Sequence, residues 1–395
     1  MTQTTDLTAL IQAQSRQLSA QLSTLRERNF PPSSMKSFRR IAPAEAAKLL
    51  GVSESRVRQT ASDHDLGEAH NARRTYSVED VAALRRRLAS GARSAERYIP
   101  ARKDGEHLQV VTVMNFKGGS AKTTTSAHLA QYLALRGYRV LAVDLDPQAS
   151  LTALFGIHSV ADLSSGDTVY GAIRYDSERR DMASLVRPTY LPGLSLAPGG
   201  LELMEFEHET PRALSRQGDG GVALFARLAE AIRSVEADFD IVIVDCPPQL
   251  GYLGLSALVA ATSVLVTVHP GMLDVMSMSQ FLAMTGDLLS VIADALPDGA
   301  RPTYDWQRYL LTRFEPNDGP QQQVAAFLRT LFAEHVLKNA TLKSTAISDA
   351  GLTNQTIYEV DRTQFTRSTY DRAVEAVDAV NREIEELVLN AWGRR

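Results

Sequence analysis

The stretch that decides the fold is VVTVMNFKGGSAKTTTSAHLAQYLALRG, which spans Val110–Gly137. It opens with an apolar run typical of a strand that is buried on both faces. It continues with a helical pattern over Thr123–Arg136, and the final glycine is a common helix stop. The loop between them carries two glycines, which let backbone N–H groups approach an anion, and the helix N-terminus adds free donors. The sequence therefore predicts a phosphate-binding strand–loop–helix unit.

Two side chains of this unit are suited to nucleotide chemistry. Lys122 is expected to reach the β- and γ-phosphates, and the Thr123 hydroxyl is expected to ligate Mg²⁺. The ordinary P-loop template does not fit, because Phe116 stands where its first glycine should be and Ala121 where its last should be. What fits is the deviant form K-G-G-x-x-K-[ST], which begins with an extra lysine. The predicted loop comprises Lys117, Gly118, Gly119, Ser120, Ala121, Lys122, Thr123 and Thr124.

The region from about residue 105 to residue 395 alternates apolar runs with helical patterns. The further runs are Val140–Asp144, Ile241–Asp245, Val264–His269 and Tyr309–Arg313. Because they are continuously apolar, we expect βαβ units and a doubly wound, mainly parallel sheet, the α/β class of P-loop NTPases. Ligands of such sheets bind beyond the carboxyl ends of the strands, where Asp144, Asp146 and Asp245 stand.

A basic segment precedes this region. The chain has a formal net charge of −4, yet residues 35–103 carry 15 Lys/Arg against 8 Asp/Glu. Of the 42 basic and 46 acidic residues in the whole chain, 27 and 38 lie outside this segment. A basic block on an acidic chain favours a module that faces phosphates. A solvated charged face would have the same composition.

The basic segment carries a helix-turn-helix pattern. Ala44–Leu50 and Glu54–Ala61 are predicted helices joined by a glycine-bearing turn, and Ser53 can cap the second. The string EAAKLLGVSESRVR resembles the winged helix-turn-helix of MerR-like regulators. A capping box at Ser77 predicts a further helix that runs through Leu88. A generic three-helix domain is the alternative.

The predicted DNA contacts of this segment fall into two groups. The exposed side of the second helix would present Arg56, Arg58 and Gln59 to base edges in the major groove. Arg73 and Arg74 would contact phosphates from a wing, which adds affinity without sequence information.

The chain begins with a third kind of segment. Apolar residues form one helical stripe at Leu7, Leu10, Ile11, Leu18, Leu22 and Leu25, and the stretch Pro31–Ser34 ends it. This stripe needs a cover, either from its own chain or from a second copy, and both readings stay open. We therefore expect an N-terminal amphipathic helix at 1–34, a winged helix-turn-helix at 35–104 and an ATPase domain at 105–395.

The amino-acid composition is typical of a globular protein of the cytosol. The 44% hydrophobic and 22% charged content is ordinary for a soluble globular chain. There is no run of 18 uncharged apolar residues and no secretory signal, so neither a membrane span nor export is predicted. Cys246 is the only cysteine, which excludes an internal disulfide and a cysteine-ligated cluster within one chain. These features favour the cytosol.

Three segments in order resemble the ParA/MinD ATPases. They are the deviant phosphate loop, VLAVDLDPQASLTALFG at Val140–Gly156, and FDIVIVDCPPQLG at Phe239–Gly251. Together with the basic segment, they resemble the RepA/ParA proteins that segregate plasmids and secondary chromosomes. The resemblance implies Mg²⁺ and ATP as cofactor and substrate, and a homodimer. It also implies a ParB-type partner, operator and non-specific DNA binding, and a cytoplasmic, nucleoid-associated protein.

The resemblance also implies residue roles. Lys122 corresponds to the P-loop lysine, and Lys117 to the signature lysine that crosses a dimer interface to the partner's phosphates. Asp146 corresponds to the residue that positions the attacking water. Thr123 would ligate Mg²⁺, with Asp144 and the Walker B carboxylate Asp245 in its outer shell. Phosphoryl transfer needs just such cation clamps, Mg²⁺ and an oriented water.

Two further sites rest on looser matches. Pro270, Met272 and Arg313 lie where the family usually holds the adenine. A C-terminal region that resembles the family's non-specific DNA surface contains Lys343, Arg362, Arg367 and Arg372. A solvated face would explain these basic residues equally well.

The sequence thus predicts an ATP-dependent partition protein that also represses its own operon, weakly active alone and stimulated by DNA and its partner. A nucleotide-regulated transcriptional repressor is an alternative that the sequence separates poorly. A MinD-like membrane-cycling ATPase is disfavoured, because residues 371–395 carry acidic side chains that anionic lipid would repel. An iron-protein-type reductase is disfavoured by the single cysteine.

Overall fold

The computed structural model describes residues 7–29, 36–70, 73–115, 117–157, 162–217, 224–295 and 303–394. The chain divides into two units, Met1–Ser37 and Phe38–Arg395. In the first unit, helix α1 (Leu7–Asn29) exposes Leu7, Leu10, Ile11 and Leu18. The predicted stripe positions Leu22 and Leu25, and the predicted stop at Pro31–Ser34, lie outside the described side chains and residues.

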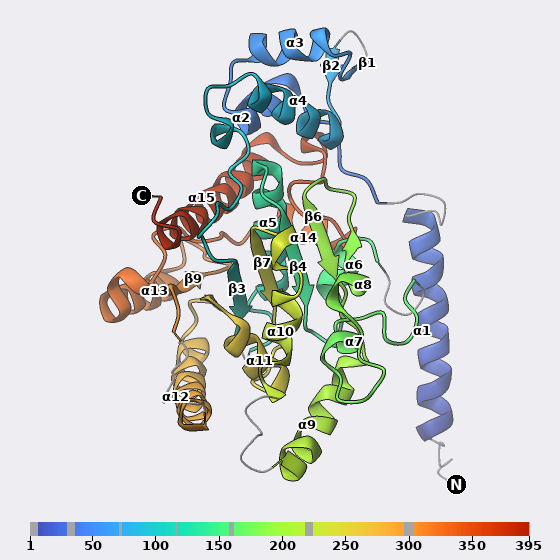
Figure 1. Ribbon diagram of the computed structural model, residues 1–395, viewed down its shortest axis with the longest axis vertical. Helices are drawn as coiled ribbons and strands as arrows, with labels where there is room; N and C mark the ends of the chain where they lie inside the picture. Colours follow the sequence, from blue (N-terminus) through green and yellow to red (C-terminus); the bar gives the residue numbers. More distant parts are fainter. Residues whose placement is uncertain are drawn as a thin grey trace. The chain divides into compact units, whose positions relative to one another are not determined.

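The second unit is built on a seven-stranded sheet of order β5-β6-β4-β7-β3-β8-β9 (Figure 1). Every pairing is parallel except that between β5 and β6. The expected mainly parallel α/β fold is therefore confirmed. The strands are β3 (Gln109–Met114), β4 (Val140–Asp144), β5 (Arg187–Pro188), β6 (Leu194–Ala197), β7 (Ile241–Asp245), β8 (Ser263–Val268) and β9 (Trp306–Leu311).

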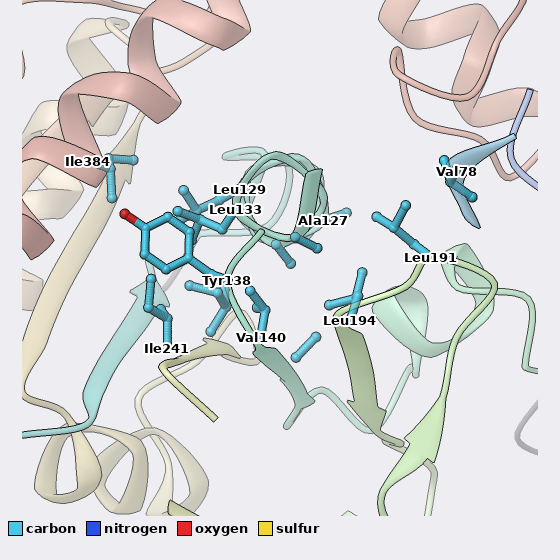
Figure 2. Close-up of a cluster of buried hydrophobic side chains, with 14 of the residues drawn as sticks. Val78, Ala127, Leu129, Leu133, Tyr138, Val140, Leu191, Leu194, Ile241 and Ile384 are labelled. Atoms are coloured by element: carbon cyan, nitrogen blue, oxygen red, sulfur yellow. The ribbon is translucent and has the colours of Figure 1, made fainter. Parts of the chain in front are cut away.

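Helices cover both faces of this sheet. Successive strand residues point to opposite sides, so apolar strands present an apolar surface on each face. Val111 and Val113 belong to a core shared with α5 (Lys122–Arg136) and α15 (Arg367–Ala391). Val110 and Met114 belong to a second core shared with α11 (Tyr252–Ala260) and α12 (Met272–Ala295). Part of the first core is shown in Figure 2.

The remaining helices that follow β4 pack around the sheet, and most of them contribute to its two cores. They are α6 (Ser150–Leu154), α7 (Tyr170–Ile173), α8 (Met182–Leu185), α9 (Leu203–Gln217), α10 (Arg227–Arg233), α13 (Gly319–Phe332) and α14 (Thr345–Leu352). Sequence reasoning missed β5 and β6. These strands have two and four residues and lie in a proline- and glycine-rich stretch, so they are too short for a periodic signal.

The three helices that local signals predict are present in the segment before the sheet. Its elements are α2 (Pro43–Leu50), α3 (Glu54–Asp63), the antiparallel pair β1 (Glu68–His70) and β2 (Arg73–Thr75), and α4 (Val78–Ser90). Gly51 adopts φ +64°, as a helix-ending turn requires. The capping box at the start of α4 is confirmed, since Ser77 and Asp80 each accept the other's backbone N–H, at 3.1 and 2.8 Å.

This N-terminal segment shares its hydrophobic core with the sheet. Ile41, Tyr76 and Leu84 are fully buried and belong to the same cluster as Leu133 and Tyr138. The segment therefore packs directly on the sheet's helices.

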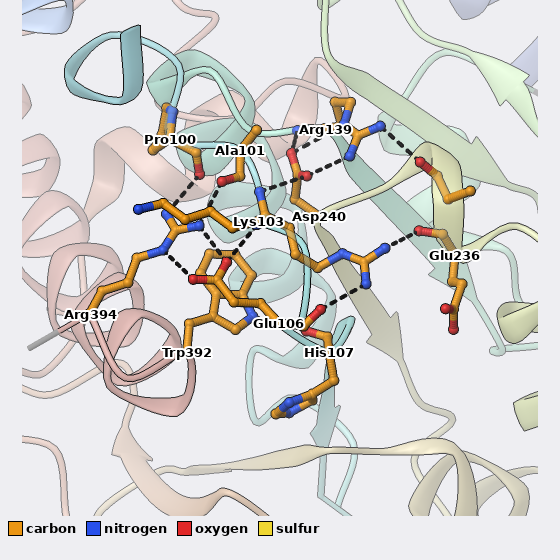
Figure 3. Close-up of polar contacts among 12 residues, drawn as sticks. Pro100, Ala101, Lys103, Glu106, His107, Arg139, Glu236, Asp240, Trp392 and Arg394 are labelled. Atoms are coloured by element: carbon orange, nitrogen blue, oxygen red, sulfur yellow. Dashed lines mark hydrogen bonds and ion pairs between the residues drawn. The ribbon is translucent and has the colours of Figure 1, made fainter. Parts of the chain in front are cut away.

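The linker into β3 is also held at several points (Figure 3). Arg394 donates to the backbone oxygen of Ala101 and pairs with Glu106, and the Trp392 indole donates to the carbonyl of His107 at 2.9 Å. On its other side, the buried Asp240 accepts the Arg102 N–H at 3.0 Å. Residues 101–107 are thus fixed to both the C-terminus and the strand layer.

One helix of the described part of the chain, over Met272–Ala293 of α12, is long and apolar enough to cross a membrane by length and composition. It carries Asp274 and Asp287, which interrupt its apolar sequence. Met278 and Phe281 pack into the second core, so a single helix of this kind is weak evidence for a membrane.

Candidate nucleotide site

The loop between β3 and α5 has the shape of a phosphate cradle. Gly119 and Ala121 adopt φ +78° and +66°. An alanine in this left-handed conformation is strained by about 1 kcal/mol, and the ordinary template places glycine there. Gly118 is exposed, and a Cβ added to it would meet no atom within 4 Å. Phe116 lies outside the described residues.

Neighbouring strand ends hold the loop in place. Lys117 N–H donates to Asn115 Oδ1 at 3.0 Å, and Asn115 donates in turn to the carbonyl of Thr267. The Thr312 hydroxyl donates to the Ser120 carbonyl at 3.0 Å, and Arg313 Nη1 donates to the Gly119 carbonyl at 3.2 Å. These contacts fix the carbonyls of Gly119 and Ser120 to the neighbouring strand ends.

The two lysines of the loop differ in their surroundings. Lys122 is 7% exposed, its Nζ donates to the Lys117 carbonyl at 3.3 Å, and burial lowers its pKa. Lys117 is 40% exposed, and its Nζ lies 2.8 Å from Asp274 Oδ1 in the first turn of α12. Sequence reasoning missed Asp274, because an ion pair between two residues so far apart in the sequence leaves no local pattern.

Two acidic strand ends form the candidate metal site. The parallel register pairs Asp144 of β4 with Asp245 of β7, and neither is exposed. Asp245 accepts the hydroxyls of Thr123 at 2.7 Å and Ser126 at 2.9 Å. Burial, and then the charge of Asp144, raise the pKa of Asp245 to about 8.

Asp144 is held by a second set of donors. It accepts the backbone N–H and the hydroxyl of Thr152, and burial still raises its pKa to about 6. Such oxygen donors suit Mg²⁺, which proteins bind through one or two carboxylates plus phosphate oxygens. A divalent cation would supply the positive charge that these paired carboxyl groups lack, so the residues fit the ion.

Asp146 lies at the same edge and is 9% exposed. Its backbone N–H donates to Asp144 Oδ1 at 3.1 Å, and its own carboxylate accepts the Gln148 N–H at 2.9 Å. Gly199 closes this corner: a Cβ there would lie 2.8 Å from the Asp144 carboxyl carbon. Thr152 and Gly199 were missed by sequence reasoning, and only the double glycine after β6 hinted at a close approach.

Of the three predicted adenine residues, Arg313 contacts the phosphate loop. Pro270 is buried directly after β8, whereas Met272 opens α12 and is 62% exposed. Arg313 lines a small cavity of about 50 Å³ together with Ala121 and Thr124. Its guanidinium contacts the Gly119 carbonyl and so braces the loop.

Two residues that the sequence assigned to structure are buried. His128 makes contacts at 2.6 Å with the Thr124 carbonyl and at 3.1 Å with the Ile357 N–H, and burial lowers its pKa. Cys246 is buried, and burial raises the pKa of its thiol.

All three side chains that are predicted to read DNA bases are exposed on α3. Arg56, Arg58 and Gln59 are exposed, whereas Val57 is buried. Arg58 pairs with Glu54 at 2.9 Å. Arg74 is half-buried on β2, and the side chain of Arg73 lies outside the described side chains.

The C-terminal basic residues have acidic neighbours. Lys343 lies 2.9 Å from Glu315, and Arg362 pairs with Asp371. Arg367 is 85% exposed and lies 3.8 Å from the same aspartate, while Arg372 is exposed. These pairs offset part of the positive charge expected of a DNA surface.

The comparisons with known proteins agree with this architecture. A protein-family model described as an AAA domain matches residues 108–296. The chain is 56% identical to a putative replication protein A of Rhizobium rhizogenes over 98% of this chain and 96% of that one. It is 30% identical to the protein SopA of Escherichia coli K12 over 83% of this chain and 82% of that one.

Solved structures show the same fold. A partition protein aligns with a TM-score of 0.64 at 18% identity, covering 95% of this chain and 98% of that one. A cobyrinic acid a,c-diamide synthase from Mycobacterium smegmatis, solved with ADP and magnesium, aligns with a TM-score of 0.51 at 28% identity over 62% and 91% of the two chains. From its strand–loop–helix site and its full-length relatives, we conclude that the chain belongs to the family of ParA-type partition ATPases.

Proposed function

We propose that this chain hydrolyses Mg·ATP as a dimer, binds operator and non-specific DNA, and partitions a replicon while repressing its own operon. The observation that carries the proposal is the arrangement at the start of α5. There, a buried Lys122, the Thr123 hydroxyl and the carboxylates of Asp144, Asp146 and Asp245 surround one helix N-terminus. This set offers what phosphoryl transfer needs, namely cation clamps, a metal site and a group to orient water.

Each residue has a distinct task in this proposal. The loop N–H groups and Lys122 bind the phosphates, while Thr123 and Asp245 hold the metal. Mg²⁺, when bound, neutralises charge on the phosphate oxygens. Asp146 orients the attacking water, and Lys117 reaches the phosphates of a second protomer after it leaves Asp274. A magnesium-bound relative in fold supports this use of the site.

The DNA-binding part of the proposal rests on α3. Its exposed face presents two arginines and a glutamine, side chains that read guanine and adenine edges. In the first unit, the exposed apolar face of α1 suits a second copy of the chain, which would set two α3 helices against the half-sites of an inverted repeat. We expect a cytoplasmic protein associated with the nucleoid, with a ParB-type partner that stimulates hydrolysis.

One experiment tests this function against a plain repressor. ATP turnover and the affinity for the promoter region of its own operon are measured with no nucleotide, ADP and ATP, with random duplex as control. We expect slow turnover that DNA accelerates. Promoter binding that responds to nucleotide without any turnover would instead identify a nucleotide-regulated repressor.

A further inference from the structure

A buried arginine links the N-terminal segment to the helix that follows the phosphate loop. Arg85 lies on α4 and is 7% exposed. Its guanidinium donates to three backbone carbonyls: Leu135 at 2.5 Å, Tyr98 at 2.9 Å and Leu49 at 3.1 Å. None of the ion pairs described includes this side chain. The carbonyl dipoles therefore provide most of the electrostatic stabilisation of its buried positive charge.

Two of these carbonyls end helices that matter for function. Leu135 lies in the last turn of α5, and Leu49 lies in the last turn of α2. A cation at a helix C-terminus is stabilised by the helix dipole and by carbonyls that lack partners. Arg85 therefore joins the C-terminal ends of two helices: α5, which begins at the phosphate loop, and α2, which packs against α3.

The chain makes room for this contact at one residue. Gly137 ends α5 with φ +104°, and a Cβ there would lie 2.7 Å from Arg85 Cδ and 3.1 Å from its Nε. A side chain at this position would displace the arginine.

The helix α2 borders a cavity on one side, while its Ala46 and Leu50 are buried in the core that it shares with the sheet. A cavity of about 800 Å³ lies between α2, α5 and α15, and its lining includes Glu45, Lys48, Tyr132 and Asp378. Across it, Lys48 pairs with Asp378 at 3.0 Å, and the lysine side chain is 67% exposed, so this ion pair is weak. Arg85 is a buried link between α2 and α5, and its acceptor residues Leu49 and Leu135 also line this cavity.

We propose that Arg85 couples nucleotide binding at the phosphate loop to the placement of the DNA-reading helix α3. The inference rests on the proposed function, because it requires both a nucleotide and an operator. The helix α5 has 15 residues and spans about 22 Å, so a small shift at its phosphate end is carried to Leu135 as a rigid displacement. Arg85 passes that displacement to α2, and α2 passes it to α3.

Linkage gives this proposal a two-way test. The factor by which a non-hydrolysable ATP analogue changes the affinity for operator duplex must equal the factor by which operator changes the affinity for the analogue. We expect a factor of about fivefold or more in the wild-type protein. In Arg85→Met, this coupling factor should lie within about twofold of unity, whether operator affinity or analogue affinity is measured. The affinity for the analogue without operator should stay near the wild-type value.

The matched control is Arg86→Met, which removes an exposed arginine from the next position of the same helix and should keep the wild-type factor. Arg85→Lys keeps the charge but loses the forked geometry, so it should give an intermediate factor. An Arg85→Met protein that folds and retains the full coupling factor would overturn the proposal.

A measurement on the unmodified protein guards against a variant that does not fold. Binding of the analogue should change the rates of amide hydrogen exchange in α2 and α3. Exchange rates in these helices that are the same with and without the analogue would overturn the coupling. If the protein binds operator with the same affinity in every nucleotide state, only this inference is wrong. Absence of operator binding in every nucleotide state defeats the proposed DNA-binding function itself.

Discussion

Asp245 and Asp144 stand side by side without exposed surface, and both have raised pKa values. The folded state therefore binds more protons than the unfolded state between the ordinary pKa of 3.8 and about 8. It follows that the contribution of these two groups to the free energy of unfolding falls as pH rises through this interval.

Asp245→Asn should remove part of that pH dependence. The amide keeps hydrogen bonds to Thr123 and Ser126 without the repulsion from Asp144, so the variant should be about 1 kcal/mol or more stable than wild type at pH 8. Its Mg²⁺-dependent turnover should be lost. Denaturant unfolding at pH 5 and pH 8 checks this, and a variant with the wild-type slope between these values would refute the electrostatic account.

Asp146 should separate binding from chemistry. Asp146→Ala keeps the loop, Lys122 and the metal carboxylates, so affinity for Mg·ATP should stay near the wild-type value. Hydrolysis should fall by about 10² or more, the typical loss for a positioned base. Gln148→Ala is the matched control, because the Gln148 side chain is exposed two residues away. Equal loss of binding and turnover would place Asp146 in a metal or folding role instead.

The Lys117–Asp274 ion pair competes with the role proposed for Lys117 across the dimer. Asp274→Asn frees the lysine, so dimerisation should occur at lower ATP concentration than in wild type. Lys117→Ala should have the opposite effect and also lower the rate of hydrolysis. Sedimentation measured over an ATP titration distinguishes the effects of the two variants on dimerisation. If both variants shift dimerisation in the same direction, the ion pair is only structural.

At the scale of elements, most of the fold could be predicted from local patterns. The runs that form β4 and β7 match their observed bounds, and β3, β8 and β9 are shifted by one to three residues at their starts. Buried parallel strands give a continuous apolar signal, and caps such as Ser77 mark helix starts. These signals depend on neighbours in the sequence, so a single chain contains them.

What could not be predicted depends on distant pairing. The position of β7 between β4 and β3 brings Asp245 beside Asp144, and no local pattern encodes strand order. The contacts of Asp274, Thr152 and Gly199 likewise arise only when separate elements meet. The loop was predicted from its residue types and the roles of its acids from the family resemblance, whereas the groups that hold them in place were not predicted.

The helix α3 and the strand β2 should affect DNA differently. Arg58→Ala should cost about 1–3 kcal/mol on the cognate operator and far less on random duplex. Its pairing with Glu54 must break on binding, which reduces the expected loss. Arg74→Ala should weaken both DNAs similarly and flatten the salt dependence. Affinity titrations at two salt concentrations check this, and an Arg58→Ala effect that is equal on both DNAs would refute base reading by α3.

At the scale of the whole molecule, the second unit works as one body. The N-terminal segment and the sheet share a hydrophobic core, and Arg394 and Asp240 hold the linker between them. Cutting the chain near Gly105 would expose that core, so point variants report on DNA binding more cleanly than truncation does. The same packing gives the nucleotide site a physical connection to α3.

The measurement that tests the central claim most directly is ATP turnover by the full chain with DNA present, for wild type and Lys122→Ala, with and without Mg²⁺. The account predicts turnover only for the wild-type protein with Mg²⁺, because Lys122 and the metal carboxylates act on the same phosphates. Wild-type turnover in Lys122→Ala, or turnover that persists when Mg²⁺ is chelated, would contradict the assignment of this site.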